Sequence, residues 1–200
     1  GTYSGTTTVA AGTLLVNGTL DTRTAGVTVN SGATLGGTGT INRPVTVNSG
    51  GTIAPGNSIG TLSTGNLTLS GTYEAEINVH PSAGTVAGTD NDLIDVTGTV
   101  SVTGGTLKVV LLNVGSIPMN GVVNRTYLIV RNDNSDSVTS PFSSVVFENA
   151  RDTMVDGTHY TIDYSGNDGN DVTLYIASVP EPAALSLLAL GALGLRRRRD

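Results

Sequence analysis

Short stretches in the first half of the chain alternate apolar residues with threonine or asparagine, as in VTVN at residues 27–30. This period of two predicts short β-strands that bury Val27, Val29, Val45 and Val47 on one face and place hydroxyl side chains on the other. Glycine and Asn-Ser-Gly segments follow each stretch and favour bends in the backbone. The pattern predicts an all-β fold of short strands and tight turns.

The strand pattern is repeated along the chain. VTVNSGATL at 27–35 and VTVNSGGTI at 45–53 share seven of nine residues, and looser copies occur at 9–16, 67–77 and 100–110. A unit of about 20 residues cannot bury its apolar face alone, whereas units stacked about 4.8 Å apart can. We therefore expect a parallel β-helix (β-solenoid) in which Asn30 and Asn48 form an internal ladder. An antiparallel β-sandwich is the alternative.

Three regions follow from this pattern: β-solenoid repeats at 1–84, less regular β-strands at 85–178 and a distinct tail at 179–200. The ends of a stack of strands need covering, so the second region either continues the solenoid or caps it. The sequence begins with Gly1 and shows no basic and apolar signal segment at its start. We therefore expect that an N-terminal part, including a secretion signal, is missing.

The tail combines a VPEP motif (Val179, Pro180, Glu181 and Pro182), an apolar run at 183–195 and a basic cluster (Arg196, Arg197, Arg198 and Arg199). The two prolines favour an extended backbone at the motif. A helix over 183–195 spans about 20 Å, less than the roughly 30 Å of a bilayer core. The run predicts a marginal membrane helix whose arginines stay cytoplasmic. A permanent short anchor and an ordinary buried helix are the alternatives.

Charge and composition exclude several classes of function. Without the tail, 14 acidic and 6 basic residues leave a net charge of −8, so the body is expected to bind neither nucleic acid nor anionic membranes. The chain has no cysteine and therefore no disulfide or thiolate metal site. Its two histidines, His80 and His159, lie in unrelated contexts and favour surface positions over a zinc site.

Candidate chemistry is limited to a few acidic motifs. Glu74 and Glu76 lie on one face of a strand, as paired carboxylates of a glycosidase do, although the same pattern is typical of a half-buried strand. The TDNDLID segment offers Asp90, Asp92 and Asp95 as calcium ligands or lyase groups, with a solvated acidic turn as the alternative.

Two further motifs suggest ligands. GNDGNDVTL at 166–174 is similar to one copy of the calcium-binding nonapeptide repeat, which makes Asp168 and Asp171 weak calcium candidates. Threonines at alternate positions, such as Thr38 with Thr40 and Thr97 with Thr99, could form hydroxyl rows that bind ice or sugar, or simply face solvent. No serine elbow, phosphate loop or histidine triad is present, and no cofactor is expected.

The repeats resemble the autotransporter-associated β-strand repeat of secreted bacterial proteins. The matching segments are GTLLVNGTL, VTVNSGATLGGTGTI and VTVNSGGTIAPGNSIGTLSTGNLTLSGTYEAEI, within about residues 6–77. NDLIDVTGTVSVTGGTLKVVLL and YTIDYSGNDGNDVTLYIA resemble segments that follow such repeats. The resemblance implies a right-handed β-helix that is exported, and it implies no particular activity.

The tail resembles the PEP-CTERM sorting signal through VPEP, the apolar run and the arginine cluster. The resemblance implies recognition by an exosortase, a membrane protease or transpeptidase. The chain would be transiently anchored in the inner membrane and then transferred to the envelope surface or an extracellular polysaccharide (biofilm) matrix of a Gram-negative-type bacterium.

These observations predict a secreted, non-enzymatic structural or adhesive protein of the cell surface. An autotransporter passenger is one alternative, but it requires a C-terminal barrel where this sequence has the sorting tail. A polysaccharide-binding or polysaccharide-cleaving β-helix is the other alternative.

Overall fold

The computed structural model describes residues 5–20, 25–80, 83–114, 124–133, 136–148 and 160–177. The regular elements in these residues are 18 β-strands, and no α-helix occurs among them, which confirms the expected all-β class. None of the described residues belongs to a helix long and apolar enough to cross a bilayer. The tail at 179–200, with its motif, expected helix and arginine cluster, lies outside the described residues.

The strands form three sheets. Sheet A contains β1 (Thr7–Val9), β4 (Val27–Val29), β7 (Val45–Val47), β10 (Leu67–Leu69) and β13 (Val100–Val102). Sheet B contains β2 (Gly12–Leu15), β5 (Ala33–Gly37), β8 (Thr52–Pro55), β11 (Thr72–Asn78), β14 (Thr106–Leu112) and β16 (Ser144–Glu148). Sheet C contains β3 (Thr19–Leu20), β6 (Thr40–Ile41), β9 (Thr61–Thr64), β12 (Leu93–Val96), β15 (Arg125–Asn132), β18 (Asp171–Ile176) and β17 (Tyr160–Gly166).

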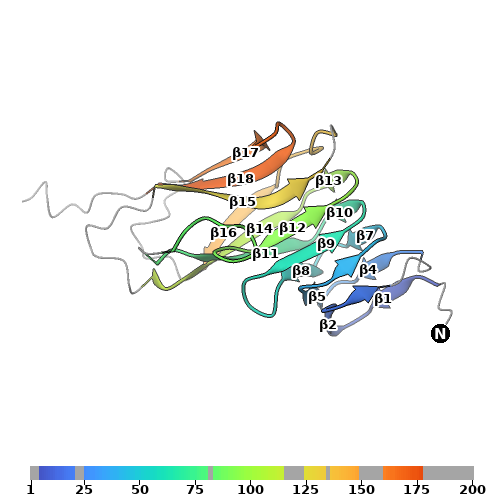
Figure 1. Ribbon diagram of the computed structural model, residues 1–200. Coiled ribbons are helices and arrows are strands. Elements are labelled where there is room, and N and C mark those ends of the chain that lie inside the picture. The colour runs from blue at the N-terminus through green and yellow to red at the C-terminus, as the bar shows by residue number, and fades with distance from the viewer. Residues whose placement is uncertain are drawn as a thin grey trace, which may run out of the picture.

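From β1 to β15 the chain enters sheets A, B and C in turn, so each strand neighbours the strand three places later in sequence. These pairs are parallel, for example β4 with β7 and β5 with β8. Figure 1 shows the result as a stack that runs from β1 and β2 in blue to β17 and β18 in red. The arrangement is compatible with the expected parallel β-helix. We refer to each set of three strands, such as β7, β8 and β9, as a coil.

The predicted core valines are buried and stacked in register. Val27 pairs with Val45, and Val29 pairs with Val47, all with at most 1% of their surface exposed. Burial of a side chain of this size contributes roughly 1.5–3 kcal/mol. The sequence repeat thus places identical valines in register inside the stack.

The asparagine ladder is present, but its predicted internal location is wrong. Asn48 Nδ2 donates a hydrogen bond to Asn30 Oδ1 at 3.2 Å, and Asn48 is exposed. Both residues directly follow sheet A strands, where the chain turns outward toward sheet B. The ladder therefore joins successive turns at the surface.

Gly37 allows one coil to approach the next closely. Its φ of +104° lies in the region that favours glycine, and a Cβ atom at this position would collide with the backbone of Val16. Gly37 also exchanges two backbone hydrogen bonds with Gly56, at 2.8 and 2.9 Å. A side chain at position 37 is therefore incompatible with the observed stacking.

The last strands depart from the parallel pattern. β18 pairs antiparallel with both β15 and β17, whereas β16 continues parallel pairing in sheet B. Phe147 of β16 contacts Tyr160 of β17 with ring centroids 5.0 Å apart, and Phe142 contacts Tyr164 at 6.2 Å. These aromatic pairs cover the end of the core between the edge strands of sheets B and C.

Candidate functional site

A groove of about 260 Å³ lies on the outer face of sheet B. It crosses the neighbouring strands β2, β5, β8 and β11, a distance of about 14 Å at the usual strand spacing. Its floor consists of small or apolar residues, Leu15, Gly36, Ala54 and Pro55. Because outward positions of a strand normally carry larger side chains, the small residues Gly36 and Ala54 create the depression.

One wall of the groove is part of a ladder of hydroxyl groups. Cα pairing aligns one outward position of every sheet B strand, and this position holds Thr13, Thr34, Thr52, Thr72, Thr106 and Ser144. Thr13 and Thr34 of this ladder line the groove. A second ladder on sheet A consists of Thr8, Thr28, Thr46, Thr68 and Ser101.

The opposite wall is the segment after β8, with Asn57 and Ser58 at the rim. Ser58 Oγ donates a hydrogen bond to Glu76 Oε2 at 3.1 Å, and Gly60 N–H donates to Asp92 Oδ1 at 2.9 Å. These two contacts attach the segment to β11 and to the start of β12. The wall is therefore held at two points.

Carboxyl groups of Glu74, Glu76 and Asp92 form the β11 end of the groove. Glu74 is paired with Lys108 Nζ at 2.9 Å, and Lys108 also contacts Glu148 at 3.0 Å. The hydrogen bonds that Lys108 donates to Glu74 and then to Glu148 raise the pKa of Lys108. The charge of Glu74 is thus neutralised by an ion pair. Among the described contacts, the Glu76 carboxylate accepts only the hydrogen bond from the Ser58 hydroxyl.

Asp92 is 1% exposed, and its carboxyl group connects two backbone segments. Its Oδ2 accepts the Glu76 N–H at 2.8 Å, while Oδ1 accepts the Gly60 N–H. Burial raises the pKa of Asp92 to about 8, although these two N–H bonds act in the opposite direction. The carboxyl group is therefore largely protonated at neutral pH, and its geometry is that of a structural link.

The groove therefore offers hydroxyl, amide and carboxylate groups around an apolar floor. No Lys, Arg or His occurs among the described residues that line it. Such a surface can exchange hydrogen bonds with hydroxyl groups and contact an apolar face, but it provides no positive charge for an anionic ligand.

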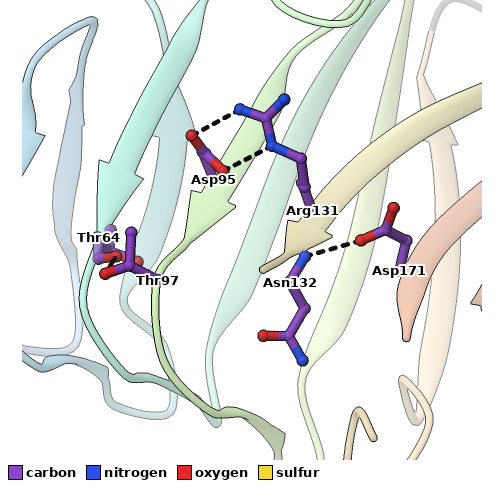
Figure 2. Close-up of polar contacts among 6 residues, drawn as sticks. All are labelled: Thr64, Asp95, Thr97, Arg131, Asn132 and Asp171. Carbon is purple, nitrogen blue, oxygen red and sulfur yellow. Dashed lines mark hydrogen bonds and ion pairs between the residues drawn. The ribbon is translucent and has the colours of Figure 1, made fainter. Parts of the chain in front are cut away.

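The structure separates the three aspartates of TDNDLID. Asp92 lies at the groove, while Asp90 Oδ2 accepts the Val86 N–H at 2.9 Å within its own turn. Asp95 lies on the outer face of sheet C, where both carboxylate oxygens contact Arg131 at 2.7 and 2.8 Å (Figure 2). The three side chains have different partners and do not form one ligand set.

Asp168 and Asp171, the weak calcium candidates, lie in different environments. Asp168 is exposed in the turn between β17 and β18, whereas Asp171 is fully buried. Asp171 Oδ1 accepts the Asn132 N–H at 2.8 Å, as Figure 2 shows, and its Oδ2 accepts Asn167 Nδ2 at 2.7 Å. Within the described residues, no group of three or more His, Cys, Asp or Glu side chains is suited to a metal ion.

The remaining candidates occupy separate places. His80 is partly buried two residues after the end of β11, and His159 lies outside the described residues. Thr38 is exposed and Thr40 lies on β6, whereas Thr97 Oγ1 donates to the Thr64 carbonyl at 3.1 Å (Figure 2). The hydroxyl rows run across coils rather than along one strand.

The sequence motifs did not predict that Glu74 and Glu76 lie beside Asp92. The signal was the glycine-rich APGNSIG segment at 54–60, whose Gly60 N–H bonds Asp92 from 32 residues away. Equivalent positions in the repeats also carried the ladder signal, since the copies align Thr28 with Thr46 and Thr34 with Thr52.

Comparison with known protein families supports the interpretation of the tail. Residues 178–199 match the model of the PEP-CTERM protein-sorting motif. The chain carries a sorting signal. This motif implies export, membrane-associated sorting to the cell surface and processing by an exosortase-type enzyme. No curated protein matches the chain.

Proposed function

We propose that this protein is a non-enzymatic structural or adhesive component of the bacterial cell surface. The PEP-CTERM motif at 178–199 carries the proposal, because it supplies the route to the surface. In this proposal the three sheets, parallel from β1 to β15, form a β-helix of the autotransporter-associated repeat type, and the resemblance of residues 6–77 to that repeat supports the assignment. A stack of strands with a repeated outward position suits a surface protein, since sheet B presents a hydroxyl group at this position on every strand.

The proposal includes cleavage near Val179–Pro182 and loss of the apolar run with Arg196–Arg199. The test is the intact mass of the mature protein isolated from envelope and medium of the native host. We expect a C-terminus near residues 179–182 in the wild type. The Glu181→Ala variant should keep its C-terminus at Asp200 and remain in the inner membrane.

Glu148→Ala is the matched control, since Glu148 is an exposed carboxylate outside the motif. This variant should be processed like the wild type. A wild-type chain that still ends at Asp200 in the mature protein contradicts the sorting part of the proposal.

A second candidate function is the binding or cleavage of polysaccharide. The observation that favours it is the groove with Glu74, Glu76 and Asp92 at one end. Incubation with neutral and acidic glycans, followed by assay of new reducing ends and unsaturated products, separates polysaccharide cleavage from the non-enzymatic proposal. Reproducible turnover that is lost in the Glu76→Gln variant overturns the non-enzymatic proposal.

A further inference from the structure

We propose that the groove on sheet B binds a segment of an uncharged polysaccharide, laid across strands β2, β5, β8 and β11. The inference deepens the adhesive function proposed above, and it rests on that function. It names the chemical class of the ligand and the surface that holds it.

The shape of the groove suits an extended chain of sugar rings. It is an open depression that crosses four strands, with a volume of about 260 Å³, at the small end of ligand sites. The floor includes Leu15, which is 49% exposed, beside Ala54 and Pro55. An exposed leucine between small residues provides an apolar contact for the C–H face of a pyranose ring.

The rim supplies hydrogen-bonding groups of the kind that sugar hydroxyls need. Thr13 and Thr34 form one wall, and Asn57 forms part of the other. Hydroxyl groups both donate and accept, and the amide does the same through separate atoms. The ladder places Thr13 and Thr34 on neighbouring strands about 4.8 Å apart, so two successive rings of a polymer can meet equivalent groups.

The charge distribution selects an uncharged ligand. Lys108 neutralises Glu74 at 2.9 Å, and Asp92 is buried with both oxygens bonded to backbone N–H groups. Glu76 leaves one negative charge at the β11 end. No lining residue is basic, so a uronate or sulfated chain is repelled, and one carboxylate is too little charge to bind a polycation strongly.

The experiment measures binding of hexasaccharides to the full 200-residue chain by two-dimensional NMR. The neutral probes are the hexamers of β-1,4-glucose, β-1,3-glucose and β-1,4-mannose. The charged probes are hexagalacturonate and the hexamer of glucosamine. We expect at least one neutral probe to shift the amide signals of Leu15, Ala54 and Asn57 saturably, with millimolar affinity, and the charged probes to bind at least about tenfold more weakly.

Ala54→Leu fills the floor and should weaken binding at least about tenfold. Ser63→Leu places the same side chain on the outer face of sheet C in the same coil, and it should bind like the wild type. Unchanged amide dispersion shows that each variant is folded. The inference is overturned if no neutral probe binds, if a charged probe binds as tightly, or if Ala54→Leu binds like Ser63→Leu.

The outcome is separable from that of the proposed function. Failure of all probes removes the glycan ligand but leaves the C-terminal mass of the mature protein unaffected. An unprocessed C-terminus removes the sorting route but leaves binding by the purified chain unaffected.

Discussion

The repeat coils at 25–80 and the closing strands at 124–177 solve the same packing problem with different residues. In the coils, the core consists of Val, Leu, Ile and Ala with Tyr73 as its one aromatic residue. In the closing strands, Tyr127 is buried, and Phe142, Phe147, Tyr160 and Tyr164 pack in pairs between two sheets. Each coil has a neighbour on both sides, so small side chains in register suffice.

The edge strands β16 and β17 have a paired neighbour on one side only among the described strands. A larger side chain covers more of the core there, and an aromatic pair adds about 0.5–1.5 kcal/mol beyond its buried area. At the opposite end, described residues 5–20 contain no aromatic residue. Among the described residues, large aromatic side chains therefore gather at the β16 and β17 end of the stack.

The largest predicted loss of stability comes from replacing a glycine in the coils, and a glycine in the closing strands provides the comparison. Gly37→Ala should lower the free energy of unfolding by about 3 kcal/mol or more, because the new Cβ collides with the Val16 backbone at a φ of +104°. Gly169→Ala, in the turn before β18, should cost only about 1–2 kcal/mol, because its φ is +109° but the space around it is open. Urea unfolding of both variants measures the difference.

Equal losses in the two variants would contradict the view that close approach between coils distinguishes Gly37. Gly37→Ala should also reduce the hydrogen-exchange protection of β2 more than that of β18, because coils contact mainly their neighbours.

An intermediate effect is expected at Asp92, which lies between the two regions. Its pKa of about 8 in the folded protein exceeds the ordinary value of 3.8 because of burial. The folded state therefore holds the proton more tightly, so this group contributes its full stability below pH 4 and loses it as the pH rises toward 8. The wild type should lose about 2–3 kcal/mol relative to Asp92→Asn between pH 5 and pH 7.

Thermal melts of both proteins across this pH range provide the measurement. The Asp92→Asn variant keeps one acceptor oxygen, so its melting temperature should change less with pH than that of the wild type. Parallel pH profiles for the two proteins would show that the carboxyl group is already ionised at neutral pH.

The smallest effect is predicted for the ion pairs that join the coils to the closing strands. Lys108 of β14 bridges Glu74 of β11 and Glu148 of β16, and all three side chains are between 27% and 50% exposed. Lys108→Met should cost less than about 1 kcal/mol, since solvent screens the pairs and the apolar stem is retained. Added salt should reduce the difference from the wild type. A salt-independent loss would instead indicate a packing role for the side chain.

The parts of the fold that depend on local pattern were predictable from sequence. Val27 and Val29 alternate with polar residues and recur at Val45 and Val47, so strand positions, the buried face and the register between copies followed directly. The location of the asparagine ladder did not, because alternation fixes the face only within a strand, whereas Asn30 and Asn48 lie just after strands.

The parts that depend on contacts distant in sequence were not predictable. The link from Gly60 to Asp92 spans 32 residues, and no periodicity connects them. The antiparallel return of β18 depends on its pairing with Tyr127 and Leu128 of β15, which the sequence of the last strands does not specify. The sorting motif was predictable because its signal lies within one short contiguous segment.

The antiparallel direction of β18 also sets where the chain departs from the stack. β18 ends at Ile176 beside Arg125, the first residue of β15, so the path toward the sorting motif starts at the aromatic end of the stack. From β18 to β9, in the same coil as the groove residue Ala54, there are three strand spacings, or about 14 Å. When the chain is attached to a surface through residues after 177, the aromatic end of the stack lies closest to that surface. The groove lies farther from it.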